Sequence, residues 1–143
     1  MGDQTSSSDL GDQLFRITRR LRHAAASATE PLGLSPHQAR ALHVIGRADG
    51  ARLSEIAERL RVAPRSTTEV VDALEAKELV ARQPDPNDRR AVLVELTPHG
   101  REVLNRATDL RSHIHATAFA VLTDAEQDQL ARLLAKVESG TPR

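Results

Sequence analysis

Residues 53–97 carry the strongest structural signal in the chain and read LSEIAERLRVAPRSTTEVVDALEAKELVARQPDPNDRRAVLVELT. Ser54 is a preferred N-cap residue and predicts a short helix, and Pro64 suits the first position of a second helix that runs to about Lys77. Residues 62–63 leave room only for a brief turn between them. Two helices joined by so short a turn are typical of a helix-turn-helix unit.

The pattern after this second helix indicates two strands. Residues 79–82 read as extended, and residues 91–97 are short and rich in β-branched side chains. The segment between them, QPDPNDRR, holds two Pro, two Asp and one Asn, which favour turns. We therefore predict a β-hairpin, called the wing below, whose polar loop carries Arg89 and Arg90 at its tip.

The segments on either side are expected to be helical. A helix is predicted from Asp9, because apolar residues recur with the period of one helix face at Leu10, Leu14, Ile17 and Leu21. Capping patterns at residues 35–38, 97–98 and 123–126 begin three more helices. The first and last helices carry apolar stripes with no partner in so small a chain, so a two-fold dimer is expected.

Composition excludes several classes of protein. The 143 residues include 20 Lys+Arg and 20 Asp+Glu, so the chain is neither a strongly basic nucleic-acid tail nor an acidic disordered protein. Without cysteine there is no disulfide scaffold and no zinc-thiolate finger. No apolar run approaches the roughly 18 residues of a membrane span, and no apolar signal core is present, so we expect a cytoplasmic protein with no membrane partner.

The sequence offers little for catalysis or metal binding. It contains no Ser-His-Asp arrangement, no Gly-rich phosphate loop and no paired catalytic carboxylates, so we expect no enzyme, no catalytic residues and no cofactor. The six His are scattered, and His113 and His115 lie two positions apart on different helix faces. No metal site is expected.

Two motifs carry a resemblance to a known family. They are the wing with its following turn, DPNDRRAVLVELTPHG at residues 85–100, and the pattern Thr-x-x-Val-Val-Asp-x-Leu-Glu at residues 67–75. From about Leu10 to Val137 the chain resembles the MarR (multiple-antibiotic-resistance regulator) family of bacterial transcription factors. Two residues depart from the family pattern: Glu69 stands where many members have a basic or neutral residue, and Glu78 replaces a common glycine.

The expected fold class is mainly α (α+β), a winged helix-turn-helix with flanking N- and C-terminal dimerisation helices. We divide the chain into a disordered tail (1–8), an N-terminal dimerisation helix (9–35), a winged helix-turn-helix DNA-binding domain (36–97), C-terminal dimerisation helices (98–138) and a frayed tail (139–143). The resemblance implies a homodimer that binds a pseudo-palindromic double-stranded operator and represses transcription. It also implies that a small aromatic or phenolic ligand releases the protein from its operator DNA.

Candidate DNA contacts follow from this arrangement. The first residues of the second helix meet base edges in helix-turn-helix proteins, which selects Arg65, Ser66, Thr67 and Thr68. Arg65 suits guanine, and a carboxylate at Glu69 repels phosphate but can accept from cytosine N4. From Arg61 to Arg90 the sequence has six basic and six acidic residues, so this segment carries no net charge. DNA binding is therefore expected to depend on a few well-placed arginines.

The wing supplies the second set of contacts. Either Arg89 or Arg90 can enter an A·T-rich minor groove. The resemblance implies that the equivalent of Asp88 pairs with an arginine and holds the wing. We expect Arg90 to be that partner and Arg89 to be the freer arm.

The remaining expectation concerns the ligand site. We take Arg16, His23, His43 and Arg47 as candidate pocket residues. The scarcity of aromatic residues leaves open a winged-helix regulator without a small-molecule sensor. A winged helix used as a protein-interaction module is the third possibility.

Overall fold

The computed structural model describes residues 6–48 and 50–141. Its elements in chain order are α1 (Ser7–Thr29), a 3-10 turn (Glu30–Leu32), α2 (Pro36–Gly46), β1 (Ala51–Arg52), α3 (Leu53–Leu60), α4 (Pro64–Ala76), β2 (Val80–Asp85), β3 (Asp88–Leu96), α5 (Pro98–Phe119) and α6 (Asp124–Gly140). This order is that of a winged helix-turn-helix with long flanking helices, as predicted.

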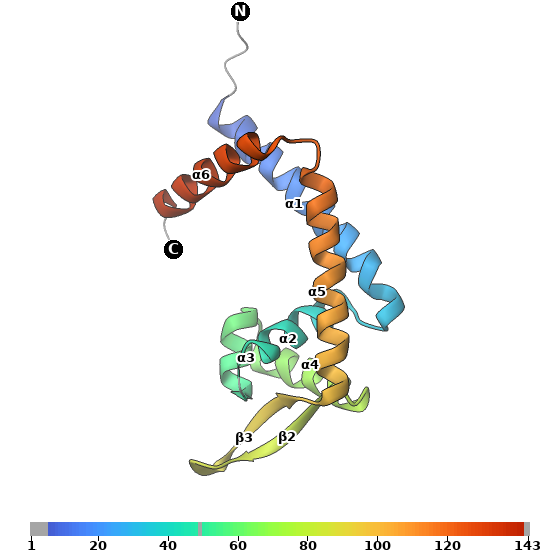
Figure 1. The fold of residues 1–143 in the computed structure, drawn as a ribbon. Helices are drawn as coiled ribbons and strands as arrows, with labels where there is room; N and C mark the ends of the chain where they lie inside the picture. The colour runs from blue at the N-terminus through green and yellow to red at the C-terminus, as the bar shows by residue number, and fades with distance from the viewer. Residues whose placement is uncertain (1–5, 49, 142–143) are drawn as a thin grey trace, which may run out of the picture.

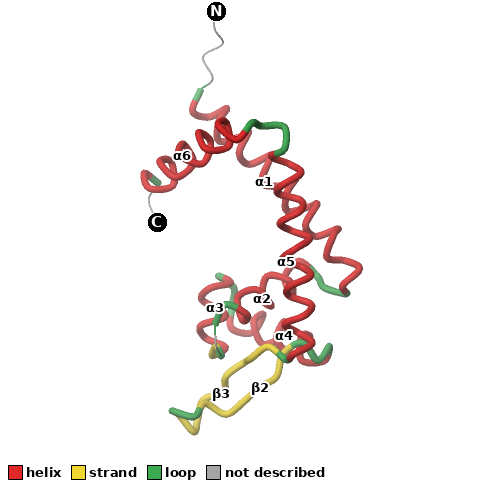
Figure 2. Tube along the Cα trace, viewed as in Figure 1, coloured by secondary structure: helices red, strands yellow, loops and turns green. Residues whose placement is uncertain are grey.

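The molecule is C-shaped (Figure 1). α5 spans its length, α1 lies against α5, and α6 turns away at the end remote from the wing. The helices α2, α3 and α4 gather at the other end with the hairpin of β2 and β3 (Figure 2). We call this second end, residues 34–97, the lobe.

The lobe contains the hydrophobic core. Its largest fully buried side chains are aliphatic apart from one threonine: Leu42, Ile45, Ile56, Leu74, Val71, Val80, Val94 and Thr67. α5 begins against this core at Gly100, where an added Cβ would lie 1.8 Å from the carbonyl oxygen of Leu79. Only glycine permits so close an approach of two backbones.

The sheet has three antiparallel strands in the order β1-β3-β2. Ala51 of β1 pairs with Val94, and Val80 of β2 pairs with Leu96. Pro84 lies on the edge strand β2, where its missing N–H leaves no partner strand unsatisfied.

Three predicted boundaries are corrected by the structure, two of them through local hydrogen bonds. α1 begins at Ser7, within the predicted disordered tail, because Ser6 and Asp9 form a capping box. α3 begins at Leu53 instead of after Ser54, and the Glu55 carboxylate accepts the Arg52 N–H at 2.8 Å. α6 continues to Gly140, within the predicted frayed tail. Residues 1–5 and 142–143 of the two predicted tails lie outside the described residues.

The wing is longer than predicted. β2 continues to Asp85 and β3 begins at Asp88, so most of the segment predicted as loop belongs to the two strands, whose register shifts between Pro84 and Asp85. The Asp85 carboxylate accepts the Asn87 N–H at 2.8 Å, which closes the turn over two residues. This is an Asx-type turn, in which a side chain replaces a backbone acceptor.

Candidate nucleic-acid interface

The exposed face of α4 begins where the helix begins. Pro64 occupies the first position, and Ala63 before it supplies no side-chain cap. The first amide groups of a helix carry partial positive charge and favour a phosphate when no cap satisfies them. The predicted contact residue Arg65 lies in this first turn, with its side chain 92% exposed.

The four predicted contact residues of α4 do not share one environment. Ser66 and Thr68 are exposed, and the Thr68 hydroxyl donates to the Pro64 carbonyl at 3.1 Å. Thr67 is fully buried against the core, and its hydroxyl lies 3.4 Å from the Ala63 carbonyl. Thr67 is therefore a core residue, which corrects its prediction as a DNA contact.

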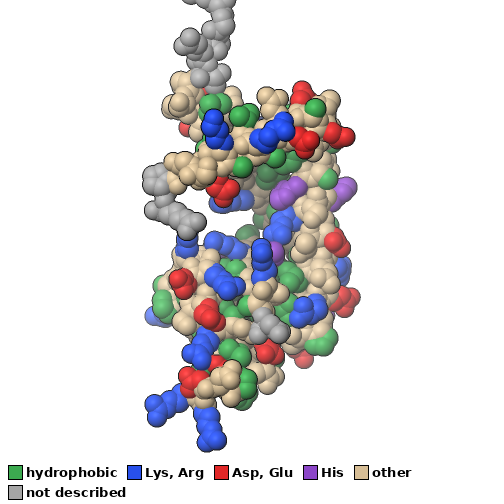
Figure 3. Space-filling view, turned by 60° about the vertical axis from the view of Figure 1, so that its left-hand side comes forward, with side chains coloured by type: hydrophobic (Ala, Val, Ile, Leu, Met, Phe, Trp, Pro, Cys, Tyr) green, Lys and Arg blue, Asp and Glu red, His purple; other side chains and the backbone are tan. Residues whose placement is uncertain are grey.

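Arg89 and Arg90 are both exposed on the wing. Figure 3 shows basic side chains projecting from the end of the molecule where the hairpin lies. Both lie at the start of β3, directly after the turn, and neither forms an ion pair within the part of the chain that the structure describes.

Asp85 holds the tip of the wing. Its carboxylate is buried, and it accepts from Arg52 Nη2 at 2.6 Å and Nε at 3.2 Å. The Asn87 N–H and the Arg52 guanidinium hold the pKa of Asp85 below its ordinary value, and the hydrogen bond to Asp85 raises the pKa of Arg52. Sequence reasoning missed both residues, although the Asp-Pro-Asn run is an Asx-turn signal.

Asp88 contributes to the same cluster, with a partner other than the one predicted. Its carboxylate lies 3.7 Å from Arg52 Nη2 and accepts the backbone N–H of Arg90 at 3.0 Å. The expected ion pair with the Arg90 guanidinium is corrected, because β1 brings Arg52 to the wing in its place. The Arg90 side chain is left exposed beside that of Arg89.

Arg82 joins the wing to α4. From β2 it lies 2.5 Å from Asp72 and also contacts the Glu75 carboxylate, both on α4. The Arg82 side chain is 26% exposed, but the side chains of Asp72 and Glu75 are 59% and 41% exposed, so solvent still screens both pairs. These contacts connect the base of the wing to the second half of the candidate recognition helix.

A hollow of about 510 Å³ lies between α1, α2 and α5. Arg22, Arg40 and Arg111 line it with His37 and His43, and none of its lining residues is acidic. Burial, then the charges of Arg111 and Arg47, lower the pKa of His43. Of the predicted pocket residues only His43 lines this hollow; Arg16, His23 and Arg47 are exposed outside it.

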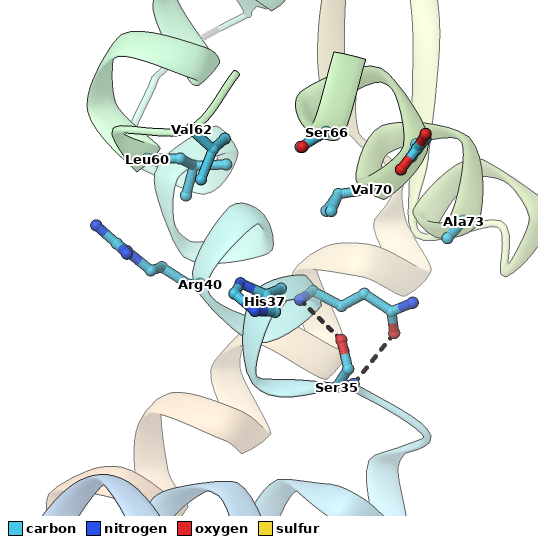
Figure 4. Close-up of a pocket in the computed structure, with 10 residues that line it drawn as sticks. Ser35, His37, Arg40, Leu60, Val62, Ser66, Val70 and Ala73 are labelled. Carbon is cyan, nitrogen blue, oxygen red and sulfur yellow. Dashed lines mark hydrogen bonds between the residues drawn. The ribbon is translucent and has the colours of Figure 1, made fainter. Parts of the chain in front are cut away.

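A second hollow of about 420 Å³ lies between α2 and α4. Figure 4 shows Ser66 and Val70 of α4 on one side of it and His37 and Arg40 of α2 on the other. The acidic Glu69 also lines this hollow, so its negative charge offsets the positive charge that Arg40 brings to the lining. The α1/α2/α5 hollow, which has arginines and no carboxylate, is the better site for an anion.

Large apolar side chains are exposed at the end of the molecule remote from the wing. On α1 they are Leu10, Leu14, Phe15 and Ile17, and near or on α6 they are Val121, Leu133, Leu134 and Val137. Phe15 is 73% and Val121 is 86% exposed in the single chain. A soluble monomer rarely leaves so much apolar surface in one region.

Within residues 6–48 and 50–141, no three His, Asp or Glu side chains gather as a metal ion requires. None of the helices in the described part of the chain combines the length and apolar character of a membrane span.

Several known proteins are similar to this chain in sequence and in architecture. The MarR family model matches residues 34–92. The HTH-type transcriptional repressor MdtR of Bacillus subtilis is 31% identical over 130 residues, which cover 91% of this chain and 84% of the relative. A mutant of MarR from E. coli, solved in complex with operator DNA, superimposes with a TM-score of 0.75 and 28% identity, covering 95% of this chain and 99% of that one. A Mycobacterium tuberculosis MarR family protein, Rv2887, solved with p-aminosalicylic acid, superimposes with a TM-score of 0.72 and 29% identity. The match covers 90% of this chain and 98% of that one.

Proposed function

Because this chain belongs to the MarR family of helix-turn-helix transcriptional regulators, which are not enzymes, we propose that it is a homodimeric repressor that binds a pseudo-palindromic operator. One observation carries the proposal. The exposed face of α4 and the arginine-tipped wing belong to one lobe, in which Arg82 of β2 bridges the wing to Asp72 and Glu75 of α4.

The proposed contacts divide by groove. Arg65, Ser66 and Thr68 enter the major groove, where arginine recognises guanine and hydroxyls bond bases or phosphates. Arg89 and Arg90 lie along the minor groove, where narrow A·T-rich DNA has the most negative potential. Two copies of this surface fit half-sites about one helical turn apart.

The proposed domain division follows the same logic. Residues 36–97 bind DNA, and the helices before and after them form the dimer by covering the exposed apolar side chains of α1 and α6. We expect light scattering to give twice the 15.6 kDa chain mass. Leu14→Glu should give monomers and weaken operator binding, whereas Gln13→Glu adds the same charge at a polar position. A monomeric wild type at micromolar concentration contradicts the dimer.

Operator binding is tested by fluorescence anisotropy with DNA from upstream of the chain's own gene at physiological salt. We expect nanomolar affinity, at least ~10³-fold tighter than for scrambled DNA. Arg89→Ala and Arg90→Ala should each weaken binding, while Arg132→Ala on α6 should not. Equal, weak affinity for both DNAs from every source tested contradicts the proposal and favours a protein-interaction module.

We further propose that a small aromatic or phenolic acid releases the DNA. The hollow between α1, α2 and α5 supports this, because three arginines and no carboxylate line it. A ligand there contacts both the lobe and the dimerisation helices, so it can favour one spacing of the lobes by ~1–3 kcal/mol.

The probe for this site is p-aminosalicylic acid, the compound bound in the Rv2887 structure. It should raise the melting temperature of the wild type and lower its operator affinity. Arg111→Ala should abolish both effects, whereas Arg106→Ala, an exposed position of α5 outside the hollow, should retain them. No response to a panel of such acids favours a regulator without a small-molecule sensor.

A further inference from the structure

Glu69 stands at the centre of the exposed face of α4. Thr67, Val71 and Leu74 are fully buried, and a helix turns about 100° per residue, so position 69 points directly away from the core. Arg65 lies on the same face one turn earlier. The side chains of Arg65 and Glu69 are 92% and 67% exposed.

Arg65 and Glu69 contact each other through only part of their polar atoms. Arg65 Nε donates to Glu69 Oε1 at 3.3 Å. Within the part of the chain that the structure describes, the Arg65 Nη atoms and Glu69 Oε2 have no other hydrogen-bond partner. The pair therefore keeps the Arg65 Nη donors and one acceptor oxygen of Glu69 available at the exposed surface of the helix.

The stability of the fold does not explain this carboxylate. An exposed ion pair four residues apart contributes only a few tenths of a kcal/mol. The neighbouring carboxylates of α4, Asp72 and Glu75, are both engaged by Arg82. Glu69 is thus the carboxylate of α4 that stays directed outward, on a surface where negative charge opposes binding to phosphate.

The major groove offers such a carboxylate a specific partner. Cytosine presents its N4 amino group there, and Glu and Asp accept from it, while arginine donates two hydrogen bonds to guanine. Four residues of helix rise about 6 Å, which is close to two base steps of about 3.4 Å. Arg65 and Glu69 therefore reach base pairs that are one or two steps apart.

We propose that Glu69 reads a cytosine beside the guanine contacted by Arg65, so that one position of each operator half-site depends on this carboxylate. The inference rests on the proposed function and names the base that the site selects. Glu69 also lowers affinity for DNA that lacks the cytosine, because its charge is then unpaired against the backbone. It acts both by attraction to one base and by repulsion from the others.

The test is selection of binding sites from randomised double-stranded DNA with the full-length protein, followed by affinity measurement. Wild type should enrich a half-site with an invariant cytosine one or two base steps from an invariant guanine. Changing that cytosine should cost wild type at least about tenfold in affinity. Glu69→Ala should enrich the same site without the cytosine preference and bind non-specific DNA more tightly than wild type.

Glu58→Ala is the matched control, because it removes one exposed carboxylate from the same lobe on α3. It should keep the cytosine preference even if its general affinity for DNA rises. Identical selected sites for wild type and Glu69→Ala would overturn the inference while leaving the proposed function intact. Failure of wild type to enrich any site would overturn the proposed function and the inference with it.

Discussion

Arg52 Nη2 lies 2.6 Å from Asp85 Oδ2, although the two residues are 33 positions apart in the sequence. Arg52 belongs to the two-residue strand β1, and Asp85 ends β2 at the tip of the wing. Since β1 pairs with the other side of β3, this ion pair spans the sheet from one edge strand to the other. It couples the start of α3 to the turn that carries the wing arginines.

Asp85→Asn should loosen the wing without unfolding the lobe. The amide loses the charged hydrogen bonds from Arg52, so we expect faster amide hydrogen exchange in residues 85–92 and weaker operator binding. The pKa of Asp85 is lower in the folded state than its ordinary value of 3.8. The Asp85 carboxylate therefore stabilises the fold at neutral pH, and this stabilisation is lost only as the pH falls below 3.8. Asp128→Asn on α6 is the control, and unchanged exchange in the wing would contradict this role.

Gly100→Ala should destabilise the protein severely. Its Cβ would lie 1.8 Å from a backbone oxygen of Leu79, so α5 must move away from the lobe. We expect a loss of at least about 3 kcal/mol in the free energy of unfolding, measured by urea denaturation. Gly11→Ala in α1 meets no atom within 4 Å and should be neutral or stabilising by about 0.5–1 kcal/mol. Equal stability of the two variants would show that the backbones do not approach as described.

Thr67 and Thr68 should respond differently to the loss of their hydroxyl groups. Thr67→Val keeps a β-branched shape in the core, so operator affinity should stay within about twofold of wild type, with a modest loss of stability. Thr68→Val removes an exposed hydroxyl from the proposed groove face and should weaken operator binding by about 1 kcal/mol at comparable stability. Anisotropy and thermal melts on both variants check this, and the reverse order of affinities would place Thr67 at the interface.

His43 should make the protein less stable in mild acid. Burial and the arginines Arg111 and Arg47 lower its pKa in the folded state below 6.5, so the unfolded chain takes up the proton first. The free energy of unfolding should therefore fall as pH decreases from about 7.5 through 6.5, and level off once the folded state is also protonated. His43→Gln should flatten this part of the profile, and His115→Gln, on the exposed part of α5, should not. Parallel profiles for wild type and His43→Gln would refute the assignment.

Much of the fold was predictable because its signals are local. Capping boxes form where the sequence predicted them, at Ser35 and Thr123. The helices α2, α4 and α5 each begin at a proline, also as predicted. A cap depends on atoms within one helical turn, so three or four adjacent residues carry the whole signal. The helix-turn-helix order, the arginine-tipped hairpin and the family resemblance all follow from such short patterns.

The tertiary structure alone determined which distant charges meet. The burial of Thr67, by contrast, was readable from the sequence, because Thr67, Val71 and Leu74 recur at the spacing of one helix face and Thr68 does not. The partner of the wing carboxylates is Arg52 because the register of β1 on β3 brings it there, and no local pattern encodes that register. For the same reason the arginines of the hollow, Arg22, Arg40 and Arg111, could not be found by inspection, since three separate helices bring them together.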